Sequence, residues 1–118
     1  MAKVFGMHAI ELKPGVSEQE FEEFIRTEVI PVYRQVPGQT THLLKGDRGE
    51  RGGKYLVLIE LESQERRDHI YPPAEDGGGV AEDVLQLVGN TDHVWEKFAT
   101  FAEGFPDPAF TDYVMVSD

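Results

Sequence analysis

Side chains along residues 3–12 alternate in the manner of a β-strand. One side of this segment would carry Val4, Gly6, His8, Ile10 and Leu12. The opposite side would carry Phe5, Met7, Ala9 and Glu11, so both sides are mainly apolar. Because successive side chains of a strand point to opposite faces of a sheet, the pattern predicts a strand that is covered on both faces.

The next apolar stripe has the spacing of a helix. Ser17 and Glu20 match a capping box, which predicts that a helix starts at Ser17. Pro31 lies inside this helix and lacks the backbone N–H that helical bonding needs, so we expect a kink near residues 27–30 or two helical pieces. The stripe itself consists of Phe21, Phe24, Ile25, Val29, Val32, Tyr33 and Val36.

Two further strand-like segments flank a glycine-rich loop. Residues 39–46 are rich in threonine and leucine, and residues 54–62 are apolar almost throughout. The loop between them, residues 46–53, is short and rich in glycine. Such a connection favours an antiparallel hairpin.

The second half of the chain predicts helices followed by a last strand. A short helix begins at Ser63 and ends before Pro72, and a second helical segment follows from Val80. Residues 90–104 continue this segment, with Gly104 as its stop. Residues 110–116 form the last strand. The apolar positions of the helical segments are Val80, Val84, Leu87, Val88, Trp95, Phe98, Ala99 and Ala102.

The elements therefore follow the order strand, helix, strand, strand, helix, helix, strand. Two strand–helix–strand units around a central hairpin predict an α+β fold, the ferredoxin-like split βαβ sandwich with a four-stranded antiparallel sheet. Helices cover one face of such a sheet, whereas these strands are apolar on both faces. Because a bare apolar face is typical of an interaction surface, we expect a second copy of the chain to bury it in a homodimer.

Length, composition and charge narrow the class of protein. The 118 residues predict one domain, residues 1–118, and the absence of cysteine excludes disulfides and cysteine-based metal sites. No segment has the apolar run of a signal peptide or a membrane span, which predicts a soluble, cytoplasmic protein. The net charge of −11 disfavours nucleic acid and membranes as partners. The one basic stretch, residues 45–54, is better explained by a solvated hairpin than by an anion site.

Several short motifs, taken in order, resemble the stress-responsive family within the dimeric α/β-barrel superfamily. They are "PGVS" before a Phe-rich helix, "VPG", a hairpin, "LES", "YPP" and "VWEKF", and the resemblance spans roughly residues 3–103. This superfamily includes cofactor-free monooxygenases, polyketide cyclases and haem-degrading enzymes. The resemblance implies two sheets that close into an α/β barrel, with a pocket between the sheet and the helices of each subunit.

The acid–base residues of the family cyclases are only partly matched in this sequence. Their first-strand histidine would fall at Gly6, and His8 lies two residues further on with the same facing. Their turn histidine would fall near Glu75, and their turn tyrosine at about His69. In the family pattern, residues 94–103 would form a strand, whereas their own apolar stripe favours a helix. Both alternatives stay open.

His8 is the main candidate for proton transfer. Beside Ile10 and Leu12 its imidazole should be partly desolvated, which lowers its pKa and favours the neutral base. A neutral imidazole in an apolar pocket can accept a proton from a phenol or an enolisable carbon. The alternative is a core histidine that is hydrogen-bonded to a neighbour.

His69 and Tyr71 are the other catalytic candidates, at the end of a predicted helix. A histidine there could transfer a proton, and a phenol could polarise a carbonyl group. Alternatively, a cationic His69 meets the helix dipole, and Tyr71 packs over the prolines that follow. The candidates for substrate binding are Tyr55, Trp95 and Tyr113.

Motifs for other kinds of chemistry are lacking. The four histidines show neither H-x-H nor H-E-x-x-H spacing, so no metal site is predicted, and no dinucleotide or phosphate motif is present. We expect a homodimer with a small apolar pocket that acts without a cofactor, as a monooxygenase or a cyclase/isomerase, on a small aromatic or polyketide-like molecule. Two alternatives stay open: a non-catalytic ligand-binding or stress-associated dimer, and a haem-binding protein with a single axial histidine.

Overall fold

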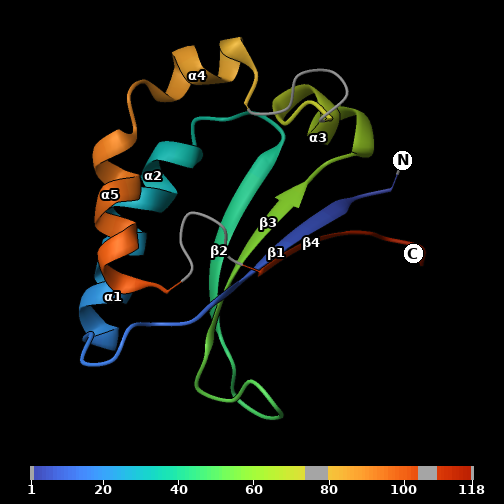
Figure 1. Ribbon diagram of the computed structural model, residues 1–118. Coiled ribbons are helices and arrows are strands. Elements are labelled where there is room, and N and C mark those ends of the chain that lie inside the picture. The colour runs from blue at the N-terminus through green and yellow to red at the C-terminus, as the bar shows by residue number, and fades with distance from the viewer. Residues whose placement is uncertain (1, 74–79, 104–108, 118) are drawn as a thin grey trace.

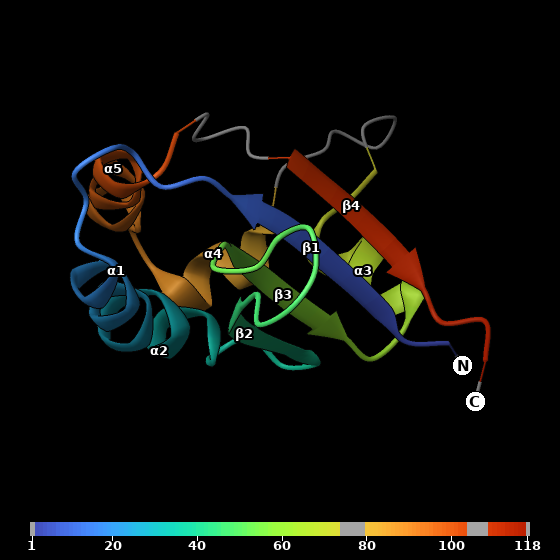
Figure 2. The ribbon, with the colours of Figure 1, turned by 90° about the horizontal axis from the view of Figure 1, so that it is seen from below.

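A single antiparallel sheet forms the centre of the molecule. The computed structural model describes residues 2–73, 80–103 and 109–117. The strand order is β2-β3-β1-β4, and every neighbouring pair is antiparallel (Figure 2). This confirms the predicted α+β, ferredoxin-like fold with a four-stranded antiparallel sheet. The strands are β1 (Val4–Ile10), β2 (Gln39–Lys45), β3 (Tyr55–Leu61) and β4 (Ala109–Val114).

The described helices lie on one side of the sheet and over one of its ends. The helical run after β1 packs beside α5 against one face, while α3 and α4 lie over the upper end of the sheet in Figure 1. None of these helices combines the length and the apolar character that crossing a membrane requires. The helices are α1 (Glu18–Phe24), η1 (Ile25–Val29), α2 (Ile30–Tyr33), α3 (Gln64–Ile70), α4 (Glu82–Val88) and α5 (Asp92–Phe101).

Serine side chains begin two of these helices, as the sequence predicts. The hydroxyl of Ser17 accepts a hydrogen bond from the backbone N–H of Glu20 at 3.2 Å. The hydroxyl of Ser63 accepts one from the backbone N–H of Arg66 at 3.0 Å. Each bond satisfies one of the N–H groups that the first turn of a helix leaves without a partner.

The kink predicted near Pro31 takes the form of a π-helical turn. The segment η1 directly precedes Pro31, which stands in the first turn of α2. The backbone N–H of Ile30 bonds to the carbonyl of Ile25, five residues earlier. Since proline cannot donate to the helix ladder, the wider turn absorbs the missing bond without ending the helical run.

The segments around residues 80–88 and 90–104, predicted as one continuing helix, are two helices. Gly89 adopts φ 71° and separates α4 from α5, a left-handed conformation that favours glycine. Residues 94–103, left open between helix and strand, belong to α5 as far as Phe101. The predicted stop at Gly104 lies outside the described residues.

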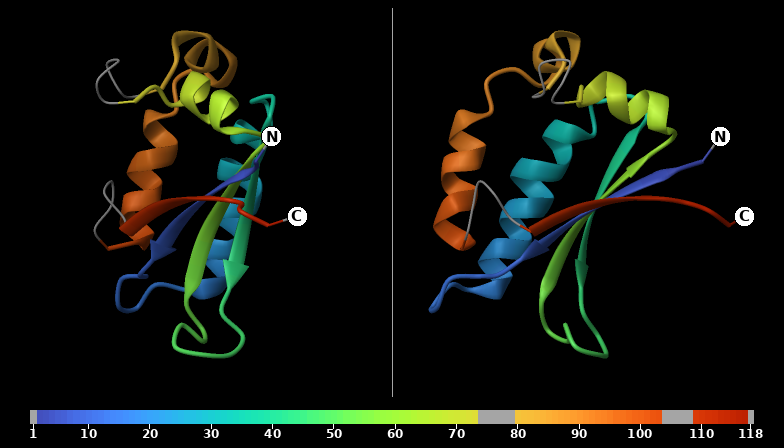
Figure 3. Two further views of the ribbon diagram at one scale, coloured as in Figure 1. Left: turned by 90° about the vertical axis from the view of Figure 1, so that its right-hand side faces the viewer. Right: turned by 45° about the vertical axis from the view of Figure 1, so that its right-hand side comes forward.

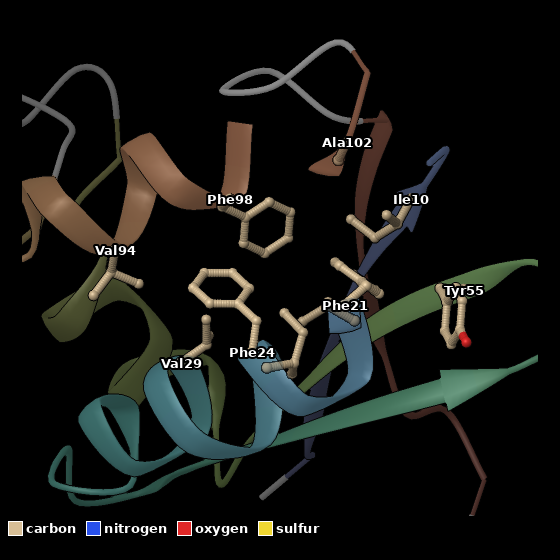
Figure 4. Close-up of a cluster of buried hydrophobic side chains, with 10 residues drawn as sticks. Ile10, Phe21, Phe24, Val29, Tyr55, Val94, Phe98 and Ala102 are labelled. Carbon is tan, nitrogen blue, oxygen red and sulfur yellow. The ribbon is translucent and has the colours of Figure 1, made fainter. Parts of the chain in front are cut away.

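A cluster of buried rings joins the helices to the sheet (Figure 4). Phe21 and Phe24 of α1 both meet Phe98 of α5 edge-on, with ring centroids 5.9 Å apart in each pair. Edge-to-face contact suits the quadrupole of aromatic rings. The buried members of the cluster are Ile10, Phe21, Phe24, Ile25, Val29, Tyr55, Val57, Val94, Phe98 and Ala102.

The other face of the sheet, which we term the open face, is covered by none of the described helices (Figure 3). The strand register gives the residues that share this face. Met7 lies between Leu58 and Thr111, and Leu58 pairs in turn with His42. Its exposed side chains include Leu44 at 45% and Tyr113 at 53%. The open face consists of Phe5, Met7, Ala9, Thr40, His42, Leu44, Leu56, Leu58, Glu60, Thr111 and Tyr113.

Candidate functional site

A cavity of about 940 Å³ lies between the sheet and the helices. Its floor is the helix-facing side of β1, β2 and β3, and α2, α3, α4 and α5 contribute to its walls. A largely apolar cavity with a few polar groups is the usual form of a small-molecule site. Its apolar lining includes Ile10, Val29, Val57, Ile59, Leu61, Val84, Leu85, Val88, Trp95 and Phe98.

His8 lines this cavity from the middle of β1. Burial lowers the pKa of His8 below its ordinary value of 6.5, and the nearby carboxylate of Asp112 acts in the opposite direction. The neutral imidazole therefore predominates at neutral pH, which is the state a proton acceptor needs. Asp112 lies where its charge can stabilise the imidazolium that forms when a proton is accepted.

An ion pair borders the cavity near His8. Arg67 of α3 donates from Nη1 to Asp112 Oδ2 on β4 at 3.0 Å, and from Nε to Asp68 Oδ1 at 2.8 Å. All three side chains line the cavity. One guanidinium against two carboxylates leaves this end of the cavity with a net charge of −1 while His8 is neutral.

Two tyrosines add neutral hydroxyl groups to the cavity lining. Tyr71, which caps the C-terminus of α3, donates its hydroxyl to Gln39 Oε1 at 2.7 Å, and burial raises its pKa. Burial also raises the pKa of Tyr33, on α2, to about 12. Both residues stay phenols at neutral pH and can orient a ligand, but neither is a base.

Trp95 of α5 forms an aromatic wall of the cavity together with its neighbours. Its ring centroid lies 5.5 Å from that of Tyr33 and 6.0 Å from that of Phe98. Its indole N–H donates to the hydroxyl of Thr91 at 3.1 Å, which fixes the orientation of the ring. A wall of this kind suits a flat apolar ligand.

Of the six residues singled out from the sequence, His8, Tyr71 and Trp95 line the same cavity. The structure places the other three elsewhere. His69 is half-exposed on α3, and its Nε2 lies 2.8 Å from Asp83 Oδ2. Glu75, matched to the turn histidine of the cyclases, lies outside the described residues.

Tyr55 and Tyr113 do not line the cavity. Tyr55 is 2% exposed at the start of β3, where it packs against Phe21 and donates its hydroxyl to the carboxylate of Glu22. Tyr113 pairs with Phe5 and therefore lies on the open face. Its neighbour Asp112 pairs with Gly6 and faces the helices instead.

The structure adds Arg67, Asp112, Tyr33 and Thr41 to the cavity lining, none of which the sequence pattern singled out. The alternation of residues along the last strand offered a partial signal for Asp112. Which of its two faces meets the helices depends on pairing with a strand more than a hundred residues away in the chain. That pairing was the missing information.

The basic stretch at residues 45–54 is largely neutralised within the structure. Arg51 and Lys54 both bond to Glu11, at 3.1 and 3.2 Å, and Lys45 bonds to Glu18 at 2.9 Å. These pairs support the solvated-hairpin interpretation over an anion site. In the described part of the chain, no group of three or more His, Asp or Glu side chains is placed to hold a metal ion.

Comparisons with known proteins bear on the fold. No family model matches the chain, and no curated protein matches it. The crystal structure of an uncharacterised NIPSNAP-like domain protein from Burkholderia xenovorans is similar, with a TM-score of 0.55 and 15% sequence identity. The similarity covers 98% of this chain and 85% of that chain. At this level of identity it supports the ferredoxin-like fold with a four-stranded antiparallel sheet, and the stress-responsive family is not confirmed.

Proposed function

We propose that this protein is a homodimeric enzyme that performs cofactor-independent acid–base chemistry on a small aromatic or polyketide-like molecule. The observation that supports this most is His8, whose pKa is lowered by burial in a largely apolar cavity beside the carboxylate of Asp112. Such an environment is typical of a general base that works near neutral pH.

Proton abstraction from the substrate is the proposed first step. The imidazole of His8 takes a proton from a carbon next to a carbonyl group, and the electrons of the C–H bond form an enolate. The guanidinium of Arg67, in the cavity lining, can meet the charge on the enolate oxygen. The hydroxyl of Tyr71 can do so as well if its hydrogen turns from Gln39 Oε1 to the substrate. The imidazolium then returns its proton, and return to a different carbon gives an isomer.

The same enolate opens two related reactions. In a cyclisation, the enolate carbon attacks a second carbonyl of the same molecule, and the resulting alkoxide takes the proton from His8. In a monooxygenation, dioxygen is the co-reactant: a CH₂ group becomes a carbonyl, and the second oxygen atom leaves as water. All three reactions require the same first proton transfer.

The charges in the cavity favour a neutral substrate. The polar end carries the net charge of −1 described above, so a carboxylate would be repelled from the position next to His8. The remaining lining is apolar, which favours a molecule with a hydrocarbon body and carbonyl or hydroxyl groups.

The open face supports the homodimer. Its centre holds Met7, Leu56 and Leu58 on adjacent strands, and its edge carries the ion pair between Lys3 and Glu60 at 3.2 Å, which adds no net charge. An apolar sheet surface of this kind is stabilised by a matching apolar surface. A second copy supplies one through a two-fold axis.

Proton exchange on 2-tetralone, an enolisable two-ring ketone, tests the proposed activity. In D₂O, the protein is expected to speed deuterium incorporation next to the carbonyl by about a hundredfold or more over buffer, measured by ¹H NMR. Gly6→Leu should remove the acceleration, since Gly6 lies in the cavity floor and a leucine there fills the space. Circular dichroism checks that this variant is folded.

A rate equal to that of buffer would contradict the enzyme proposal. If 2-tetralone then still binds to the protein and Gly6→Leu prevents binding, the non-catalytic ligand-binding alternative takes its place. A strong Soret band on addition of haem would instead favour the haem-binding alternative.

A further inference from the structure

Thr41 carries a buried hydroxyl group that has no hydrogen-bond partner among the described residues. Thr41 also lines the cavity. Buried polar atoms are nearly always hydrogen-bonded, because leaving one without a partner destabilises the protein. The amide nitrogen of Gln39, two residues earlier on the same face of β2, is likewise buried without a partner. At Thr41, the cavity lining therefore includes hydrogen-bonding capacity that the described protein groups do not use.

The strand register places Thr41 and the catalytic end of the cavity on opposite sides of its floor. Thr41 pairs with Ile59, Ile59 pairs with Gly6, and Gly6 pairs with Asp112, so these four form one row across the helix-facing side of the sheet. His8 is the next residue after Gly6 on this face. At the usual spacing of strands, Thr41 and Gly6 are about 10 Å apart.

The floor is low at Gly6. Gly6 has no side chain, and Ile59 is the one residue of the row that separates it from Thr41. Above the floor stands the aromatic wall of Trp95 and Tyr33. A flat molecule can therefore lie along the row, with one end at Thr41 and the other near His8.

We propose that the ligand is an elongated, neutral molecule of two fused rings that carries an oxygen atom at each end. One oxygen, a carbonyl, lies near His8 and Arg67, where the proton transfer takes place. The other, a hydroxyl or second carbonyl, is bound by the hydroxyl of Thr41, which makes Thr41 a specificity-determining residue. This inference rests on the proposed function, because it takes the same cavity as the ligand site.

Two matched ketones test the role of Thr41. 6-Hydroxy-2-tetralone carries a hydroxyl at the end remote from its ketone, and 6-methyl-2-tetralone carries a methyl group of similar size there. The dissociation constants of both are measured by isothermal titration calorimetry with the wild-type protein, Thr41→Val and Thr41→Ser. We expect the wild type to bind the hydroxyl compound about tenfold more tightly, the value of one buried hydrogen bond.

The two variants separate the hydrogen bond from packing. Thr41→Val keeps the shape of the side chain and should bind both ketones equally. Thr41→Ser keeps the hydroxyl and should retain most of the tenfold preference. Because valine and threonine both favour strands, Thr41→Val is expected to fold, and circular dichroism verifies this.

The outcomes distinguish this inference from the proposed function. Equal binding of the two ketones by the wild type overturns the inference, and the proposed function still stands if exchange on 2-tetralone is accelerated. A preference that Thr41→Val abolishes supports the inference, even if exchange is not accelerated and the proposed activity fails. Failure of both ketones to bind overturns the inference and removes the cavity as the ligand site.

Discussion

Replacement of His8 by alanine is expected to slow proton exchange on 2-tetralone by about 10²- to 10⁴-fold, the usual contribution of a general base. The reason is that His8 is the histidine of the described chain that lines the cavity, where burial keeps it neutral. The rate is measured by ¹H NMR in D₂O at saturating ketone. Under this condition, weaker binding of the ketone does not lower the measured rate.

The pH dependence of the wild-type rate gives an independent check on His8. The neutral imidazole is the active form, and its pKa is lowered from 6.5. The rate should therefore rise with pH, with a midpoint below 6.5, and be level at neutral pH. His93→Ala, on the exposed side of α5, is the matched control and should leave rate and pH profile unchanged. A His8→Ala protein that keeps the wild-type rate would show that another group is the base.

Replacement of Leu58 by glutamate is expected to convert the proposed homodimer into a monomer. Leu58 lies at the centre of the open face, between Met7 and His42 on the adjacent strands. In a two-fold dimer the substitution occurs twice, and each copy would bury a carboxylate without a partner. We expect the dissociation constant to rise at least a hundredfold, as about 3 kcal/mol over the two sites would produce.

Leu87→Glu provides the control for this experiment. Leu87 is an exposed leucine on α4, remote from the open face, so the same change of charge there should leave the dimer intact. Sedimentation velocity over a range of protein concentrations measures both variants. A wild-type protein that sediments as a monomer at micromolar concentration would contradict the dimer, as would a Leu58→Glu protein that remains dimeric.

The fold could be predicted largely from local signals. Capping serines, the proline inside a helical stripe and the alternation of apolar residues are short-range features, and Ser17, Ser63 and Pro31 acted as expected. The break at Gly89 was missed because the apolar positions on either side of it continue at helical spacing. The spacing of apolar residues does not reveal that one glycine between them has a positive φ.

The candidate site could be predicted only in part, because it depends on contacts between distant segments. His8 could be identified from its own strand, since its apolar neighbours imply burial. Asp112 and Thr41 depend on the register of β4 and β2 against the rest of the sheet, which the sequence pattern does not give. His69 drew attention as a histidine near a turn, yet the rotation of α3 points it toward Asp83 and away from the cavity.

The proposed activity and the proposed role of Thr41 both require that the cavity between the sheet and the helices receives the ligand. Titration of ¹⁵N-labelled protein with 6-hydroxy-2-tetralone, followed by two-dimensional NMR, tests this claim directly. The largest shifts are predicted for the indole N–H of Trp95 and the backbone amides of His8 and Thr41. The claim would be contradicted if these three signals did not shift, or if shifts occurred only at residues outside the cavity lining, such as Leu44 and Leu87.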